Sequence, residues 1–405
     1  MAGAIIAPAL PGIHAAFINT ADAELLTRLL LTTPALAIAL SAPVAGYLID
    51  RVGRRPVLLT GLVTYAAAGT SGLYLPSLPW LLGGRLVLGL AVAATMTATT
   101  TLIADRYAGP RRARFLACQA AFTGLGGVLF LLAGGGMADH HWRMPFAVYV
   151  VSLAVLVAAL RTLPEPSRGA LIQRDAGDLG VHGETHRRLI AALYAFAFGA
   201  MALMFVLPVQ LPFMLEERLG ASGLSTGLAI GSATFWSALA SLSAPSVITR
   251  IGRPRTLALT FAPVVVGYLL IGHASTWVEI FAGLLLVGAG LGLLMPNVAM
   301  WLSVLAAPQV RGRVLGGLTT ATFAGQFISP LLAQPLLSGG RYERLFQVGA
   351  GLALALALVA LLIGRGADHG VVEEHAPSGG LEVVELPATG RDDEDDHRAS
   401  GEEQR

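Results

Sequence analysis

One short stretch carries an unusual concentration of charge. Residues 46–56, GYLIDRVGRRP, hold the carboxylate of Asp50 and three guanidinium groups within six consecutive positions, whereas residues 35–45 and 57–68 are almost wholly apolar. The chain as a whole is 55% hydrophobic and only 13% charged. A buried core tolerates such charge poorly, because each unpaired ion loses its hydration. The stretch is therefore predicted to lie at a boundary between lipid and water.

Arg85 is the second charged position of interest, because it stands about six residues inside an apolar run that begins near Pro79. A guanidinium within a membrane span costs a few kcal/mol and usually faces the bundle interior or a water-filled path. The alternative is snorkelling to the surface, since Pro79 is only about 9 Å away along a helix axis. We expect Arg85 to face the interior. For Arg28, three residues into its run, snorkelling is at least as good an interpretation.

Several polar and aromatic residues also occur within apolar runs, where an amide needs a partner or water. Together with Arg85, we predict that the following line a proton or substrate path: Gln119, Gln210, Trp236, Asn297, Trp301, Phe323 and Gln326. Asn297 is the strongest candidate, because Pro296 frees backbone carbonyls beside it. For each residue, a bond to a neighbouring helix is the alternative. No Asp or Glu lies deep in a run, so the sequence identifies no coupling acid.

The elements that position these residues are long apolar segments. The mean hydropathy is +0.68, and runs of about 20 apolar residues are long enough to cross the hydrocarbon layer as helices. Unbroken apolar runs exclude a membrane barrel, which needs alternation. We predict an all-α membrane protein with twelve transmembrane helices, at 2–17, 25–49, 57–75, 79–104, 113–137, 144–162, 188–215, 222–249, 256–274, 277–304, 313–338 and 343–363.

The polar segments divide the chain. Residues 163–187 form the longest internal polar stretch and are predicted to be a cytoplasmic linker between two six-helix bundles, at 1–162 and 188–363. Residues 364–405 form an acidic tail that is predicted to be disordered, because it has little apolar surface to bury. Seventeen Arg lie in or beside loops 50–56, 105–112, 163–187, 250–255 and 305–312, and four beside the opposite loops. By the positive-inside rule both termini are cytoplasmic.

An internal repeat supports the two bundles. At an offset of about 200 residues, 41–56 (SAPVAGYLIDRVGRRP) aligns with 243–255 (SAPSVITRIGRPR), 111–116 with 311–316, and 142–146 with 342–346. Two homologous halves imply a pseudo-twofold axis along the membrane normal and a solute cavity between them, near the midplane.

The charged loop resembles a motif of the major facilitator superfamily (MFS), which has Gly, three residues, Asp, Arg, one residue, Gly and two basic residues between helices two and three. The matching residues are Gly46, Asp50, Arg51, Gly53, Arg54 and Arg55. Arg85 and Gly89 resemble an element of the family's fourth helix, and 311–330 resembles the eleventh helix of bacterial exporters. The resemblance covers residues 1–363. Helix five has glycines at 124–136 but lacks the Gly-Pro pair of the family's antiporter element.

The resemblance implies a conformational latch formed by this loop together with Arg311 and Arg313. Asp50, at the cytoplasmic end of helix two, would accept hydrogen bonds from nearby Arg and from the N-terminus of helix eleven, whose partial positive charge favours a carboxylate. Gly46 is expected to allow close helix approach. Making and breaking the contact would accompany alternating access, and Arg85 would take part in proton movement.

The resemblance also bears on the first helix. The family has a Pro pair such as that of PALPG at the outer end of helix one, so the inner half of this helix is missing and we predict a truncated first helix. A start site placed about ten to fifteen residues too late explains this; a real, short helix that thins the bilayer is the alternative.

We predict a secondary active transporter of the bacterial inner membrane, not an enzyme. It would export small amphiphilic or drug-like solutes by rocker-switch alternating access, coupled to inward proton movement, and act as a monomer within the lipid bilayer. Uptake of a neutral metabolite, a non-transporting receptor that signals through its tail, and an inactive truncated copy are the alternatives. No nucleic-acid partner, cofactor or metal is expected: there is no Walker-type loop, the glycines of 288–292 follow no strand, and His140 and His141 have no metal-ligand spacing.

Overall fold

The computed structural model describes residues 3–107, 109–163, 184–306, 310–337 and 342–373, and these form helices without a strand. The described residues up to Gly364 form one compact unit, and those from Arg365 on belong to a second. The predicted linker 163–187, apart from its ends, and all but the start of the predicted tail lie outside the described residues.

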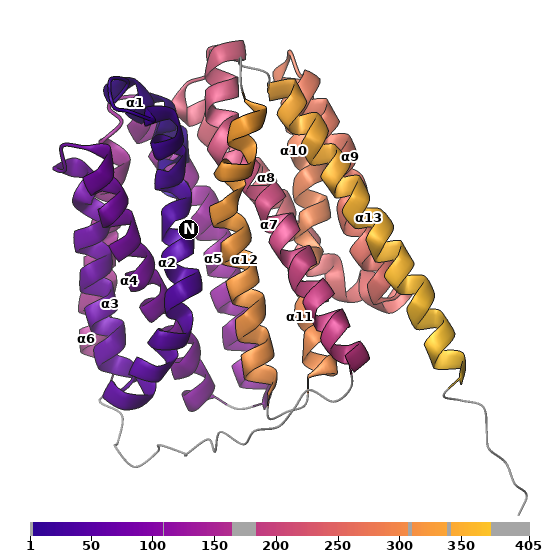
Figure 1. Cartoon of the computed structure of the whole chain (residues 1–405). Helices are drawn as coiled ribbons and strands as arrows, with labels where there is room; N and C mark the ends of the chain where they lie inside the picture. The colour runs from indigo at the N-terminus through magenta and orange to yellow at the C-terminus, as the bar shows by residue number, and fades with distance from the viewer. Residues whose placement is uncertain (1–2, 108, 164–183, 307–309, 338–341, 374–405) are drawn as a thin grey trace, which may run out of the picture. The chain divides into compact units, whose positions relative to one another are not determined.

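The long helices lie side by side (Figure 1). Their bounds are η1 Ala4–Ala9, α1 Leu10–Ala16, α2 Ala23–Val52, α3 Arg54–Gly69, η2 Thr70–Leu73, α4 Leu78–Arg106, α5 Gly109–Ala138, η3 Met144–Val150, α6 Val151–Thr162, α7 Glu184–Leu219, α8 Gly223–Ile251, α9 Arg253–His273, α10 Trp277–Gly292, α11 Leu294–Leu305, α12 Arg311–Ala333, η4 Gln334–Leu336 and α13 Tyr342–Glu373.

Every one of the twelve predicted spans corresponds to helix. Among the described residues, ten helical segments are long and apolar enough to cross a membrane; the other two predicted spans correspond to the short helix Ala4–Ala16 and to α12. The predicted span 277–304 is interrupted, because α10 ends at Gly292 and α11 begins at Leu294. Pro296 explains a break near this point, since it has no N–H to continue the helical ladder.

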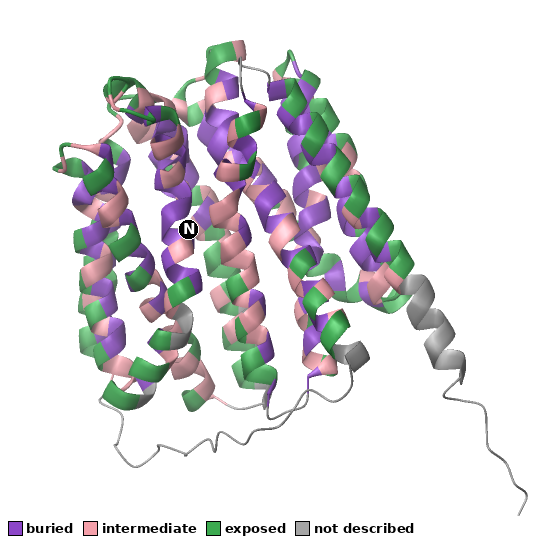
Figure 2. Ribbon diagram, viewed as in Figure 1, coloured by how far each residue is buried: buried purple, intermediate pink, exposed green. Residues whose placement is uncertain are grey.

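The outer sides of the helices carry many exposed residues (Figure 2). Phe122, Leu242 and Val278 are each more than 70% exposed, and many other large apolar residues are also exposed. A soluble protein rarely exposes so much apolar surface, whereas lipid solvates it. The described helices are therefore arranged as a membrane bundle.

Helix pairing is similar in the two parts of the chain, which we call the first half (residues 1–162) and the second half (residues 188–363). In the first half α4 packs on α2 and α3; in the second, α10 packs on α8 and α9. The halves are joined into one compact unit mainly by two helix pairs, α2 with α12 and α5 with α8. The assignment of the halves as separate bundles stays a prediction.

A pair of glycine–phenylalanine contacts supports the repeat. A Cβ at Gly72 would overlap the ring of Phe146, and a Cβ at Gly272 would lie 2.9 Å from Cβ of Phe346. Both residues of the second pair stand 200 positions after those of the first, which is the offset of the sequence repeat. Each glycine therefore lets the end of one helix pack closely against the segment that crosses it.

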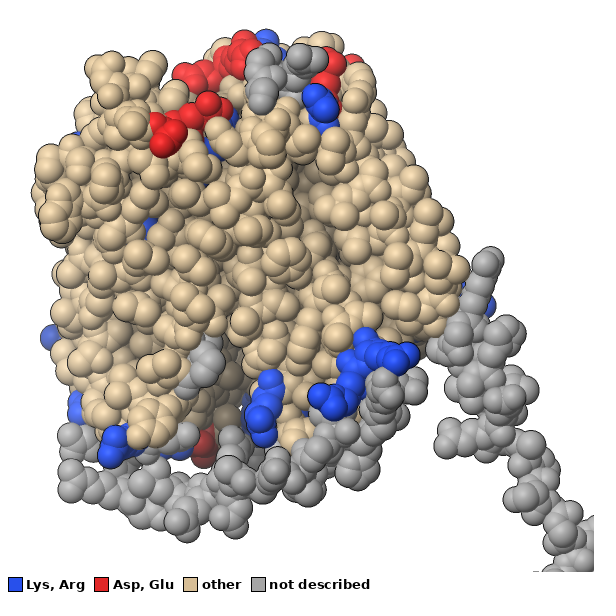
Figure 3. Space-filling view, in the orientation of Figure 1, with Lys and Arg blue, Asp and Glu red and all other residues tan. Residues whose placement is uncertain are grey.

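Charge separates the two ends of the bundle (Figure 3). We call the end that carries the α2–α3, α4–α5 and α8–α9 connections the arginine-rich face; it includes Arg51, Arg54, Arg250 and Arg253. We call the opposite end the acidic face; its carboxylates are Asp22, Glu24, Asp139, Glu216, Glu217, Glu279 and Glu343. Which face is cytoplasmic stays a prediction.

Candidate functional site

The charged loop is a tight connection between α2 and α3. Gly53 has φ +105°, a conformation that L side chains rarely adopt, so a glycine is required there. Arg54 donates to the carboxylate of Asp105 at 2.8 Å, and Arg55 to the carbonyl of Leu160 at 3.4 Å. These contacts hold the loop against the ends of α4 and α6, within the first half. Arg51 donates to the Tyr47 hydroxyl one turn earlier in α2, at 3.0 Å.

The contact between the halves that the resemblance implies at this loop stays a prediction. The side chain of Asp50 lies outside the described residues. Its proposed partners, Arg311 and Arg313, are exposed in the first turn of α12, and α12 packs along α2. A Cβ at Gly46 would meet no atom of the described residues within 4 Å, so close helix approach at Gly46 stays a prediction. Gly89 instead provides close approach, since its Cβ would meet Pro34 and Ala37 of α2.

Arg85 is fully buried, so the interior interpretation is right and snorkelling is wrong. Its Nη1 donates to the hydroxyl of Tyr149 at 2.8 Å. Its guanidinium carbon lies 4.6 Å from the ring centre of Phe146 and 5.2 Å from that of Tyr149, within the range of cation–π attraction. Its Nε and Nη2 have no hydrogen-bond partner among the described residues. A fixed charge is thus held inside the first half by aromatic groups.

Arg28, for which snorkelling was at least as good an interpretation as an interior position, is also buried, at 3% exposed. It pairs with Glu24 one turn earlier and donates to Gln334 Oε1 at 3.2 Å, at the end of α12. Its guanidinium carbon lies 5.0 Å from the ring centre of Phe213 in α7, and the His14 ring contacts the same phenylalanine edge-on. This buried charge therefore contacts both halves at the acidic face. The spacing of Glu24 and Arg28, four residues apart, was the available signal for the pair.

The predicted path residues do not form one site. Asn297 is fully buried, but its amide donates to the carbonyl of Arg253 at 3.0 Å and so joins α11 to the start of α9. Gln119 donates to Thr100 at 3.3 Å, and the amide of Gln326 approaches the Met201 sulfur at 3.9 Å. These are contacts with neighbouring helices, as the alternative interpretation expects.

The aromatic path residues are packed against neighbouring side chains. Trp236 is half-buried beside Phe235, with ring centres 5.4 Å apart, and its Cβ would contact a Cβ placed at Gly288. Trp301 is buried in the hydrophobic core, and Phe323 is half-buried on α12. Packing accounts for Trp236 and Trp301.

Gln210 differs from the other path residues. It is fully buried in α7, between Pro208 and Pro212, and neither atom of its amide has a hydrogen-bond partner among the described residues. An unpaired buried amide costs about 1–3 kcal/mol. A residue that carries such a cost without a structural partner is a candidate for binding a solute.

A cavity of about 320 Å³ lies between the halves near the acidic face. Asp139, His141 and Trp142 line it from the first half, and Glu216 and Thr226 from the second. None of the predicted path residues lines it. The cavity wall therefore combines carboxylates with one indole ring.

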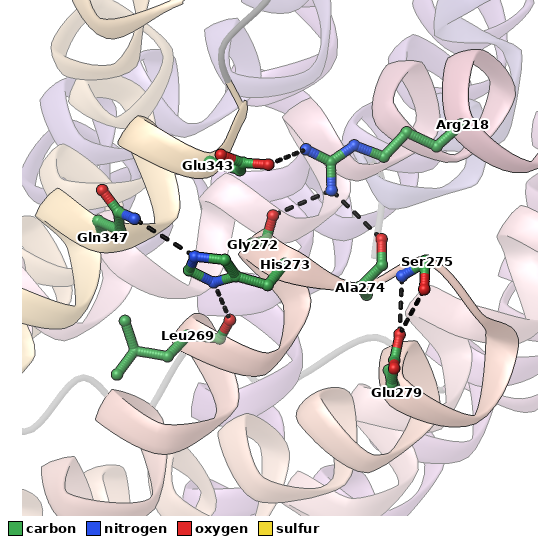
Figure 4. Close-up of polar contacts among 9 residues, drawn as sticks. All are labelled: Arg218, Leu269, Gly272, His273, Ala274, Ser275, Glu279, Glu343 and Gln347. Carbon is green, nitrogen blue, oxygen red and sulfur yellow. Dashed lines mark hydrogen bonds and ion pairs between the residues drawn. The ribbon is translucent and has the colours of Figure 1, made fainter.

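A polar cluster at the acidic face of the second half ties three helices together (Figure 4). Arg218, in the last turn of α7, donates to the carbonyls of Gly272 at 2.9 Å and Ala274 at 3.3 Å, which end α9, and lies 3.7 Å from Glu343 of α13. A cation at a helix C-terminus satisfies carbonyls that have no partner within the helix. In the first half Arg143 donates in the same way to the carbonyl of Gly72, at 2.7 Å.

Comparison with known proteins identifies the family. The class C tetracycline resistance protein of Escherichia coli is 28% identical over 339 residues, which cover 81% of this chain and 84% of that protein. The multidrug efflux protein YfmO of Bacillus subtilis (strain 168) is 26% identical over 92% of this chain and 91% of its own length. The crystal structure of a D-xylose-proton symporter has a TM-score of 0.72 at 17% identity, covering 89% of this chain and 93% of that one.

The family profile of the Major Facilitator Superfamily matches residues 1–213 and 194–385, which together span nearly the whole chain. The predicted resemblance and the predicted helical membrane fold are both confirmed by this match and by the similar structures. The chain belongs to the Major Facilitator Superfamily, and it is a multi-pass membrane transporter.

Proposed function

We propose that this transporter exports small amphiphilic or drug-like solutes in exchange for protons. The observation that carries the proposal is similarity along most of the chain to the class C and class E tetracycline resistance proteins and to the multidrug efflux protein YfmO. The buried amide of Gln210 supports it, because an uncharged donor and acceptor suits a neutral or amphiphilic solute better than a strongly anionic one.

Proton coupling needs a group that can release and rebind a proton along the path. Within membrane spans such groups are carboxylates or histidines that pair with a cation. Glu24, half-exposed and paired with the buried Arg28, fits this description and stands where both halves meet. We propose Glu24 as the coupling carboxylate, with Arg85 as a fixed charge that keeps the interior of the first half polarised.

We place the protein in a bacterial inner membrane as a monomer, with the arginine-rich face and both termini in the cytoplasm. The asymmetry of Arg between the two faces supports this orientation. Labelling of intact cells with an impermeant thiol reagent tests it, in Cys118→Ser chains that carry either Tyr74→Cys or Ile251→Cys. Residue 74 should react and residue 251 should not; the reverse would overturn the orientation.

Flux in proteoliposomes tests the transport proposal. With an imposed pH gradient, tetracycline or a cationic dye should move against its own concentration gradient, and a protonophore should abolish the movement. A sugar or nicotinic acid should not be transported. Movement of the sugar or nicotinic acid alone, in the same direction as protons, would instead establish an uptake carrier.

Removal of the tail separates transport from signalling. A chain ending at Gly364 should transport at an unchanged rate, because the predicted path lies in residues 1–363. Absence of flux in the full-length chain, together with a cellular response that requires the tail, would establish a receptor.

A further inference from the structure

The N-terminus of α8 is completed by a carboxylate from the other half of the chain. Ser222 is the N-cap, and its hydroxyl accepts the N–H of Ser225 at 3.2 Å. The two earlier N–H groups, of Gly223 and Leu224, both donate to the carboxylate of Asp139, the second at 3.1 Å. Asp139 directly follows α5. Two of the N–H groups that lack a partner within the helix at the start of α8 are thus satisfied by a residue from the first half of the protein.

The start of α10 shows the usual local solution. Thr276 caps α10, and the carboxylate of Glu279, inside the same first turn, accepts the N–H groups of Ser275 at 2.7 Å and Thr276 at 3.1 Å. All partners belong to one turn and move as one body. At α8, in contrast, the carboxylate is 84 residues away in sequence from Gly223, so the same kind of bond depends on how the two halves are arranged.

Backbone packing fixes Asp139 at this position. A Cβ at Gly223 would lie 2.6 Å from the carbonyl oxygen of Gly135, and a Cβ at Gly227 would lie 2.5 Å from that of Leu131. The ends of α5 and α8 therefore touch backbone to backbone, without side chains between them. Any motion that separates these helix ends must also break the bonds to Asp139.

The second helix pair that joins the halves carries a polar contact at the same face. Arg28 of α2 donates to Gln334, which follows α12, at 3.2 Å. Both pairs, α5 with α8 and α2 with α12, are thus joined across the halves at the acidic face.

We propose that Asp139 is a gating residue of the transport cycle, whose bonds to the start of α8 hold the acidic face closed. Opening this face moves the α8 N-terminus away from α5, which breaks two charge-assisted hydrogen bonds and removes a carboxylate from the positive end of a helix dipole. The carboxylate thereby biases the equilibrium between the two states of the transporter. This role is the same whether the solute is exported or taken up.

Accessibility of a buried thiol measures the opening. Thr226, in the first turn of α8, is 3% exposed and lines the cavity at the acidic face. In a chain with Cys118→Ser and Thr226→Cys, the rate of reaction with a water-soluble maleimide in detergent reports how often this face opens. Asp139→Asn should raise the rate about five- to tenfold; tenfold corresponds to about 1.4 kcal/mol in the population ratio.

The control is Glu216→Gln, which removes one negative charge from the wall of the same cavity. Among the described residues, the Glu216 side chain makes no hydrogen bond to the start of α8, whereas Asp139 makes two. The rate of maleimide reaction in the Glu216→Gln variant should stay within about twofold of the rate without it. This difference measures how far the loss of one negative charge alone changes the reaction. Asp139→Glu, which keeps the charge, should restore at least part of the closure. An unchanged rate in Asp139→Asn, or an equal rise in Glu216→Gln, would overturn the proposal.

A second variant, which changes a donor of the bond instead of the acceptor, keeps the test valid if the Asp139 variant does not fold. Leu224→Pro removes one of the two donors and leaves the carboxylate in place, and proline is tolerated in the first turn, where N–H groups have no partner within the helix. It should raise the rate about two- to fourfold, and an unchanged rate in a monodisperse sample would also count against the proposal. Because accessibility needs no transported solute, these outcomes are independent of the proposed export.

Discussion

The guanidinium of Arg85 donates to the hydroxyl of Tyr149 at 2.8 Å, and the two residues come from α4 and from η3. Two other atoms of this guanidinium have no partner among the described residues. A buried cation held by one neutral hydroxyl and two aromatic faces is costly, since hydroxyl and ring compensate only part of the lost hydration. We expect such a cost to be kept only where the charge is used.

Arg85→Met tests whether the charge serves stability or transport. Methionine is similar in length to arginine but carries no charge. The free energy of unfolding is therefore expected to stay unchanged or to rise by about 1–3 kcal/mol. Transport driven by a pH gradient should fall at least about tenfold. Thermal unfolding in detergent and flux in proteoliposomes measure the two effects. A fall in both would show that Arg85 is structural.

Gln210→Leu should separate binding from packing in the same way. Replacement of an unpaired buried amide by an apolar side chain of similar size removes a penalty of about 1–3 kcal/mol, so the unfolding temperature should rise. If the amide binds the solute, KM should rise about tenfold, the size of one lost hydrogen bond to a buried group. The control is Gln119→Leu. Gln119 donates to Thr100 and is partly exposed, so this variant should leave KM unchanged.

Gly72→Ala should destabilise the first half strongly. Its Cβ would overlap the fully buried ring of Phe146, and crowding of a packed core costs about 1–3 kcal/mol. Gly83→Ala is the matched control, because its Cβ would meet no atom within 4 Å. That variant should be neutral or slightly more stable, since alanine favours the helix. Equal unfolding temperatures for the two variants would contradict the close approach of η2 and η3.

Asp50→Asn tests the predicted latch at the arginine-rich face. The amide keeps the shape of the side chain but loses the charge that would bind arginines and a helix N-terminus. Insertion into the membrane should be normal, and transport should fall severely. Asp105→Asn is the control: its pair with Arg54 is half-exposed, and such pairs contribute about 0–1 kcal/mol, so transport should change less than about threefold. Near-normal flux in Asp50→Asn would make the loop a topological anchor only.

Hydrophobic length and glycine placement explain what could be predicted from the sequence. A span must bury about 20 residues in lipid, so its position is encoded locally, and all twelve predicted spans are helical. The turn at Gly53 is also local, because a positive φ excludes most other residues. The interior position of Arg85 could be predicted from the cost of placing its charge in lipid. Its aromatic neighbours could not be predicted.

Contacts between distant helices could not be predicted, because they depend on rotation and depth of each helix, which apolar composition hardly constrains. Asn297 illustrates the limit: a polar residue beside a proline suggested a solute path, whereas the structure gives it the carbonyl of Arg253. For Arg28 the sequence left snorkelling and an interior position open, and the contact with Gln334 at the end of α12 could not be predicted.

By itself, the sequence determined the membrane class, the family, the span positions and the asymmetry of charge, because each depends on composition or on a short spacing. Only the tertiary structure decided that Asp139 meets the start of α8 and that Gln210 is buried without a partner. The physical reason is that each segment forms a helix in lipid because of its own apolar composition. The partners of its buried polar groups, in contrast, depend on how the helices pack against one another.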